Sequence, residues 1–235
     1  MNIMSNDTQI AVIGISYRAP GIGRTGMWDY LAQARSAWSD IPAERFDKSA
    51  YYKTGADKSG VFRTEGAHFV PDDIYAFDAA FFNMRAEEAR NSDPQHRMML
   101  ECALEAAEDA GLSLLDIAGK KIGVYIGCGQ HEYSQRLNDD QHAAKTFSAT
   151  GIAPCMVANR LSYFFDIDGP SVALDAACAS SVYAAHQAVS ALRNRECDAA
   201  FVGAAALTLG PGGWLALEKT GYRAHPPFLI LLIIL

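Results

Sequence analysis

The chain lacks an excess of positive charge. Its 20 Lys and Arg residues are outnumbered by 27 Asp and Glu residues, which gives a formal net charge of −7. Such a composition offers no basic patch large enough for a nucleic-acid backbone, so we exclude nucleic acid as a partner.

Long apolar runs are also missing. The longest covers only residues 228–235. A helix that crosses a bilayer needs about 20 apolar residues, so no membrane span is expected. The first residues lack the basic start and apolar core of a secretion signal.

Paired cysteines are absent as well. The five cysteines are odd in number and contain no Cys-x-x-Cys pair, which argues against a zinc site and against a disulfide framework. A reducing compartment fits this pattern, and we expect a cytoplasmic protein. The cysteines stand at positions 102, 128, 155, 178 and 197.

The overall composition is typical of a soluble globular enzyme. Half are apolar and a fifth are charged, and 235 residues suffice for one sizeable core or two small ones. Asp93 followed by Pro94 predicts the start of a helix that Gly111 ends. Other signals predict strands over residues 9–16, 121–127 and 197–205, a helix over 26–36, a polar loop over 131–145, and core positions for Phe77, Phe81 and Phe82.

Two alternative sites receive little support. Gly14 follows a strand, but no Gly-x-Gly-x-x-Gly sequence opens a helix there, so a dinucleotide site is not expected. His131 and His142 lie eleven residues apart without nearby ligands in helical register, so no metal site is expected.

The most informative stretch surrounds Cys178. Residues 171–175 predict a short buried strand, and residues 179–192 predict a helix so apolar that it should be buried on all sides. Cys178 stands where strand and helix join. First-turn amides of a helix favour a thiolate and can cradle an oxyanion. A structural cysteine fits the position equally well, because free cysteine behaves as a small hydrophobe.

The sequence around this cysteine resembles a known family. Residues 175–181, Asp-Ala-Ala-Cys-Ala-Ser-Ser, resemble the Asp-Thr-Ala-Cys-Ser-Ser-Ser signature of β-ketoacyl synthases, with Ala176 and Ala179 in place of Thr and Ser. The chain is most similar to the ketosynthase domain of fungal reducing polyketide synthases. Further segments that resemble the family are residues 9–16, 41–46, 66–84, 93–101, 156–165 and 197–205.

The resemblance implies both fold and chemistry. It implies an α/β fold of the thiolase type, of which this chain would form the N-terminal half of a duplicated pair of mixed sheets with covering helices. It implies that Cys178 is the acyl-accepting nucleophile and that its backbone N–H belongs to the oxyanion hole. No cofactor would be bound directly, because the family uses phosphopantetheine on a separate acyl carrier domain. The implied partners are that carrier, malonyl and acyl thioesters, and a second ketosynthase in a homodimer.

Part of the family's catalytic machinery is not found in this sequence. Members carry two histidines, in a His-Gly-Thr-Gly-Thr motif and an Asn-x-Gly-His motif, and neither motif occurs here. His186 lies eight residues after Cys178, about 12 Å along a helix, too far to substitute. A self-sufficient thioesterase or acyltransferase that uses Cys178 alone is disfavoured because no general base can be named.

We therefore interpret residues 1–8 as an N-terminal extension, 9–222 as the N-terminal portion of a ketosynthase, and 223–235 as a divergent apolar tail produced by truncation or a frameshift. The family reaction is decarboxylative Claisen condensation, and we expect this chain not to complete it. The alternative is a non-catalytic fragment that associates with a full-length synthase or another chain. We also expect the predicted helix at 179–192 and residues 228–235 to expose an apolar patch.

Overall fold

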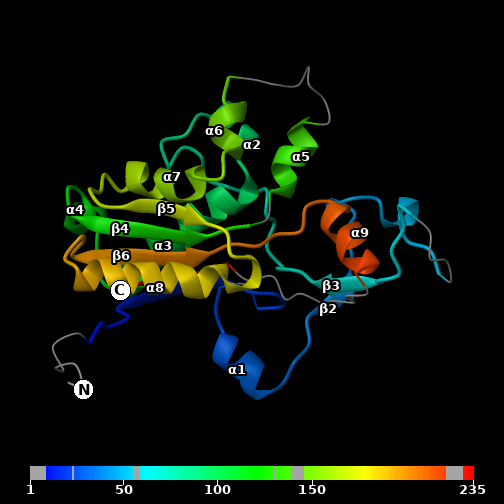
Figure 1. Cartoon of the computed structure of the whole chain (residues 1–235), viewed down its shortest axis with the longest axis horizontal. Coiled ribbons are helices and arrows are strands. Elements are labelled where there is room, and N and C mark those ends of the chain that lie inside the picture. Colours follow the sequence, from blue (N-terminus) through cyan, green and yellow to red (C-terminus); the bar gives the residue numbers. More distant parts are fainter. Residues whose placement is uncertain (1–8, 23, 55–58, 130, 139–145, 221–229) are drawn as a thin grey trace.

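The fold centres on a five-stranded mixed sheet with strand order β1-β7-β6-β4-β5 in a computed structural model (Figure 1). The structure describes residues 9–22, 24–54, 59–129, 131–138, 146–220 and 230–235. Strand β4 pairs in parallel with both β5 and β6, whereas β7 runs antiparallel to β6 and β1. The predicted α/β class with a mixed sheet and covering helices is confirmed.

The strands are β1 (Gly14–Arg18), β2 (Trp38–Asp40), β3 (Gly66–His68), β4 (Ile122–Gly127), β5 (Ser171–Leu174), β6 (Ala199–Ala204) and β7 (Ile230–Ile234). The α-helices are α1 (Met27–Ala32), α2 (Ala86–Asn91), α3 (Pro94–Asp109), α4 (Leu114–Ile117), α5 (Glu132–Asn138), α6 (Ser148–Ile152), α7 (Met156–Phe164), α8 (Ser180–Arg193) and α9 (Gly212–Lys219). In the described residues, 3₁₀ turns occur at η1 (Lys48–Ala50) and η3 (Ala177–Ala179).

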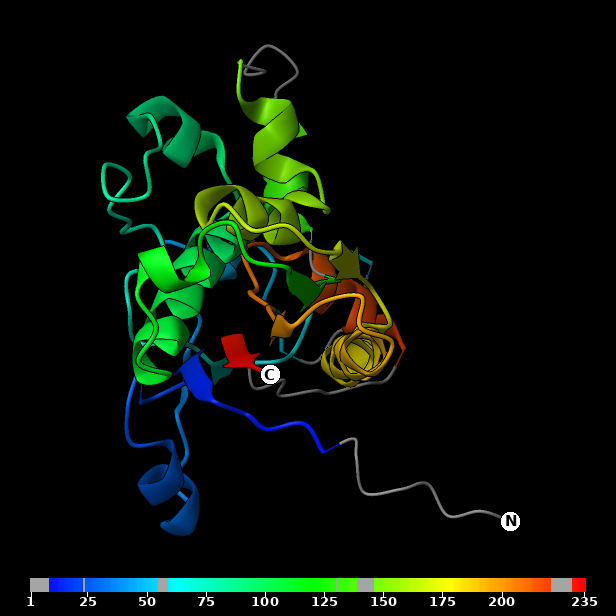
Figure 2. The same ribbon diagram turned by 90° about the vertical axis from the view of Figure 1, so that its left-hand side faces the viewer.

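Helices cover both faces of the large sheet. In the view along the strands, α8 lies on one side, while α3 and α7 lie on the other (Figure 2). The larger hydrophobic cluster fills the side of α3 and α7 and includes Met99, Leu161 and Phe201. A smaller cluster on the α8 side packs Ala184 and Ala188 of the helix against apolar residues of the sheet. The small side chains of α8 let its backbone approach the sheet closely.

Helix α3 forms as its sequence predicts. The side chain of Asp93 accepts a hydrogen bond from the backbone N–H of Gln95 at 2.8 Å, and Pro94 takes the first helical position. Gly111, with φ of 71°, follows the helix in the left-handed region that favours glycine. The helix is fastened to β1 because the buried Arg18 guanidinium donates to Glu105 at 2.6 and 2.8 Å.

The apolar residues at the end of the chain form a strand within the sheet. Residues 230–234 make β7, and Ile234 is only 2% exposed. Ile233 and Leu235 pack against the cluster on the α8 side. The expectation that residues 228–235 add to an exposed apolar patch is wrong for Ile234, which packs into the larger core, whereas Ile233 and Leu235 are half-buried.

A smaller unit stands at one end of the large sheet. Strands β2 and β3 pair antiparallel beside α9 (Figure 1). Trp214 of α9 packs on Phe62 with ring centroids 5.6 Å apart. The Arg63 guanidinium donates to the Glu218 carboxylate at 2.8 Å, which ties α9 to the segment that leads into β3.

Several local predictions need correction. The first strand begins at Gly14 rather than at residue 9, and α1 is shorter than the predicted helix over 26–36. Residues 132–138 of the predicted polar loop form α5. Phe82 is buried and Phe77 half-buried as predicted, but Phe81 is 50% exposed. Among the helices of the described residues, none combines the length and apolar character needed to cross a bilayer.

Candidate active site

The carboxyl ends of three parallel strands meet at one edge of the sheet. Strands β4, β5 and β6 end at Gly127, Leu174 and Ala204. The next residues remain hydrogen-bonded across the edge, since Cys128 N–H donates to Leu174 O and Ala205 N–H to Gly127 O, both at 2.9 Å. Ligand sites of α/β sheets concentrate outside the carboxyl ends of parallel strands. This edge is therefore the natural place for chemistry.

Cys178 lies on the turn that leaves β5 at this edge. The turn η3 holds Cys178 directly before α8. Ala177 has a φ of 51°, a left-handed conformation that costs a non-glycine residue about 1–2 kcal/mol. The predicted position of Cys178 between strand and helix is confirmed. The turn stores backbone strain, which concentrates at functional sites.

Two side chains hold the strained turn. The carboxylate Oδ1 of Asp175 accepts a hydrogen bond from the Ala177 N–H at 2.8 Å. The Ser180 hydroxyl accepts from the Ala176 N–H at 2.8 Å and donates to the Ala177 carbonyl at 2.7 Å. Three hydrogen bonds thus converge on the two residues before the cysteine.

Two glycines let β4 approach the turn. A Cβ placed on Gly127 would lie 2.7 Å from the carbonyl carbon of Ser180, and one placed on Gly129 would lie 2.5 Å from Asp175 Oδ1. Any larger residue at either position would force the turn away. Sequence reasoning missed the roles of Asp175, Ser180 and these glycines, although Asp175 and Ser180 stand within the motif that was recognised.

Cys178 differs from most of the other cysteines in accessibility. Cys178 and Cys155 are exposed, whereas Cys102, Cys128 and Cys197 are buried. Cys155 directly precedes α7, and Cys178 lies in the turn that precedes α8. The two accessible thiols therefore allow an internal comparison in any labelling experiment.

The helix that follows the cysteine is not buried on all sides. Its buried positions are Ser180, Ala184, Ala188 and Ala191. Val182 and Tyr183 are 70% and 55% exposed, which corrects the prediction that solvent would reach no side of the helix but confirms an exposed apolar patch there. An apolar groove of about 230 Å³ runs between α8 and the adjacent strands, lined by Ser181, Val182, Ala185, Val202, Gly203, Ala204 and Ile233.

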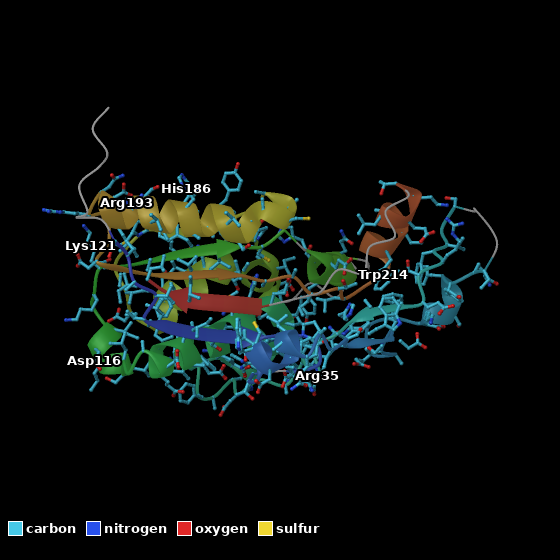
Figure 3. The ribbon with its side chains drawn as sticks, turned by 90° about the horizontal axis from the view of Figure 1, so that it is seen from below. Arg35, Asp116, Lys121, His186, Arg193 and Trp214 are labelled. Atoms are coloured by element: carbon cyan, nitrogen blue, oxygen red, sulfur yellow. The ribbon has the colours of Figure 1, made fainter. Side chains whose placement is uncertain are left out.

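The histidines of the described residues lie in very different surroundings. His186 is exposed near the middle of α8 (Figure 3). His96 is only 3% exposed, and burial lowers its pKa to about 3, so its imidazole is neutral at neutral pH. His142 and His225 lie outside the described residues.

A buried carboxylate braces the segment that follows β6. Glu132, 7% exposed, accepts hydrogen bonds from the N–H groups of Leu209, Gly210 and Gly213 at 2.7, 3.0 and 3.1 Å. Sequence reasoning placed Glu132 in a polar loop and missed this role. Nowhere in the described part of the chain do three His, Cys, Asp or Glu side chains gather in a way that could hold a metal ion.

Known proteins are similar to this chain in sequence and in fold. Residues 7–226 match the family described as "Beta-ketoacyl synthase, N-terminal domain". The chain is 75% identical over 217 residues to the highly reducing polyketide synthase Preu5 of Preussia isomera, covering 92% of this chain and 9% of that protein. It is 68% identical over 218 residues to the highly reducing polyketide synthase ACRTS2 of Alternaria alternata, with 93% and 9% covered.

Solved structures give the same result. The oxazolomycin ketosynthase domain OzmH KS7 of Streptomyces albus JA3453 superposes with a TM-score of 0.87 at 29% identity, over 95% of this chain and 41% of that domain. The ketosynthase from module 6 of the bacillaene synthase of Bacillus subtilis 168 gives 0.82 at 32% identity, with 95% and 39% covered. The chain thus spans less than a tenth of those two curated relatives and about two fifths of the solved domains.

Proposed function

We propose, from the premise that the chain belongs to the β-ketoacyl synthase family, that Cys178 is the residue that takes up the acyl group. The predicted resemblance to fungal reducing polyketide synthases and the predicted thiolase-like fold are both confirmed by the relatives and the solved domains. The observation that carries the proposal is the place of an exposed Cys178 within the family's motif, on a strained turn before α8.

The proposed step is transfer of an acyl group between two sulfurs. The Cys178 Sγ attacks the carbonyl carbon of an acyl thioester and forms a new C–S bond. The old C–S bond breaks, and the carrier sulfur leaves with the proton that the Cys178 thiol gave up. In this proposal, the amide N–H of Cys178 stabilises the oxygen that becomes negative during the transfer. In the proposed setting the leaving thiol belongs to the phosphopantetheine arm of an acyl carrier.

Condensation by this chain alone is not part of the proposal. The family's two histidine motifs are absent from the 235 residues. Among the described histidines, His186 lies eight residues after Cys178, about 12 Å at the rise of an α-helix, and His96 is buried in the fold. Without those motifs, the family resemblance assigns no residue of this sequence to stabilise the developing enolate, and loss of even one such donor typically costs 10²–10³ in rate.

A second candidate function rests on the surface of α8. Val182 and Tyr183 stand exposed on the helix that carries the site, which favours a non-catalytic role as a fragment that associates with another chain. Size-exclusion chromatography with light scattering tests this role. Association that Val182→Ser with Tyr183→Ser abolishes would support it, and an unchanged monomer in both proteins would contradict it.

The acyl transfer is tested by incubation with an acetyl thioester of N-acetylcysteamine and intact-mass analysis. We expect one acetyl group, mapped to the peptide that contains Cys178. Cys178→Ala should abolish the adduct, whereas Cys155→Ala, which removes the other exposed cysteine, should retain it. Equal acetylation of both cysteines would contradict the proposal.

A further inference from the structure

The apolar groove beside α8 begins at the turn that carries Cys178. Its lining consists of Ser181, Val182 and Ala185 of α8, residues 202–204 at the end of β6, and Ile233 of β7. Figure 1 shows α8 alongside β6. Within the sheet, Ala204 pairs with Gly127, and Gly127 packs against the backbone of Ser180, the first residue of α8. One end of the groove therefore lies against the Cys178 turn.

The helix face that lines the groove leads back to the cysteine. Residues three and four apart on a helix share one side, and Cys178 precedes Ser181 and Val182 by these intervals. The turn η3 passes directly into α8, so the same side continues from Cys178 through Val182 to Ala185. At the rise of a helix this distance is about 10 Å. An acyl group on the Cys178 sulfur would thus start at one end of an apolar surface long enough for a medium-length chain.

The lining of the groove suits an uncharged hydrocarbon chain. None of the lining residues carries a charge, and Ser181 is the one polar side chain among them. Val182 is 70% exposed, so a chain that covers it removes apolar surface from water. A carboxylate in the groove would lose its hydration without gaining a charged partner. The groove therefore disfavours chains that end in a carboxylate.

We propose that this groove binds the hydrocarbon tail of the acyl group on Cys178 and favours uncharged, medium-length straight chains such as hexanoyl over acetyl. The inference rests on the proposed acyl transfer, because it names the substrate class of the same site. A fully buried methylene group contributes about fourfold to affinity. Because the groove is partly open to solvent at Val182, we expect about twofold for each methylene, and about tenfold between acetyl and hexanoyl.

Alkylation measures the groove without requiring acyl transfer. In N-ethyl- and N-hexyl-iodoacetamide the Cys178 sulfur attacks the same carbon and displaces iodide. The two reagents differ by the same number of methylene groups as acetyl and hexanoyl. We expect the hexyl reagent to alkylate Cys178 about tenfold faster, measured by peptide mapping and corrected for the rates of both reagents with glutathione. A hexyl chain that ends in a carboxylate should react no faster than the ethyl reagent.

Two neighbouring residues supply matched variants. Val182 lines the groove and Tyr183 does not, although both are exposed, at 70% and 55%. Exposed positions tolerate substitution, so both variants should fold. Val182→Asp should bring the hexyl-to-ethyl ratio at Cys178 close to one, because it places a carboxylate in the wall of the groove. Tyr183→Asp should retain the ratio of the parent chain. Any effect of the new charge on the thiolate is the same for both reagents and cancels in the ratio.

The final measurement separates this proposal from the proposed function. It compares self-acylation of Cys178 by acetyl and hexanoyl thioesters of N-acetylcysteamine, for which we expect the same preference of about tenfold. If alkylation shows the preference but no thioester acylates Cys178, the groove assignment stands and the acyl transfer is refuted. If acylation occurs but neither reaction favours the longer chain, or if Val182→Asp and Tyr183→Asp behave alike, the groove assignment is overturned and the acyl transfer stands.

Discussion

Removal of the Ser180 hydroxyl should loosen the turn that carries Cys178. Ser180→Ala deletes an acceptor for the Ala176 N–H and a donor to the Ala177 carbonyl. Each such bond contributes about 1 kcal/mol net, so the free energy of unfolding should fall by about 2 kcal/mol. The left-handed backbone of Ala177 would then lose its restraint and could relax toward an unstrained conformation.

Two measurements test this prediction, one of stability and one of cysteine reactivity. Urea denaturation gives the change in unfolding free energy, and iodoacetamide followed by peptide mapping gives the alkylation rate of Cys178 relative to Cys155. The parent chain gives the reference ratio, because both cysteines are exposed and each precedes a helix. Ser180→Ala should change this ratio, because it alters only the turn that carries Cys178.

The neighbouring hydroxyl provides the control. Ser181 is exposed, so Ser181→Ala should change the stability by no more than about 0.5 kcal/mol and leave the alkylation ratio unchanged. If Ser180→Ala and Ser181→Ala proved indistinguishable in both measurements, the Ser180 hydroxyl would not hold the turn and the reasoning would be refuted.

Three further predictions follow from packing and charge. Gly127→Ala should lower the unfolding free energy by about 1–3 kcal/mol in urea titrations, since its Cβ would meet the backbone of Ser180, whereas Gly210→Ala has open space and should be neutral. Ile234→Ala should cost about 2–5 kcal/mol by the same method, because a buried core side chain is truncated. Burial raises the pKa of Asp93 from 3.8 to about 6. The protonated Asp93 carboxyl therefore contributes fully to the unfolding free energy below pH 3.8, and this contribution is lost as the pH rises through 6. Thermal melts should therefore show Asp93→Asn gaining up to about 3 kcal/mol relative to the parent between pH 4 and pH 7, and a difference that does not vary with pH would contradict this.

The features that could be predicted from the sequence depend on residues that are close to one another in the chain. The cap of α3 needs only Asp93 and Pro94, which act within one turn of the helix. The strand–turn–helix at Cys178 follows from a change of apolar periodicity over a few residues. Both depend on neighbours in the chain, so a single sequence is enough to place them.

The features that could not be predicted depend on contacts between distant segments. The composition of an apolar run such as residues 228–235 does not reveal that residues 230–234 pair with both β1 and β6. Likewise, Glu132 stabilises the segment after β6 only because three backbone N–H groups of that segment donate hydrogen bonds to it. The exposure of Val182 depends on what covers α8, which the helix's own composition does not reveal.

Cys178 is proposed to take an acyl group, and this chain alone is predicted to form no carbon–carbon bond. The direct measurement is incubation of the chain with an acetyl thioester and a malonyl-loaded acyl carrier protein, followed by mass spectrometry of both proteins. We predict an acetyl adduct at Cys178, absent from Cys178→Ala, and a carrier that bears no acetoacetyl group. A Cys178-dependent acetoacetyl carrier, or an adduct that persists in Cys178→Ala, would contradict it.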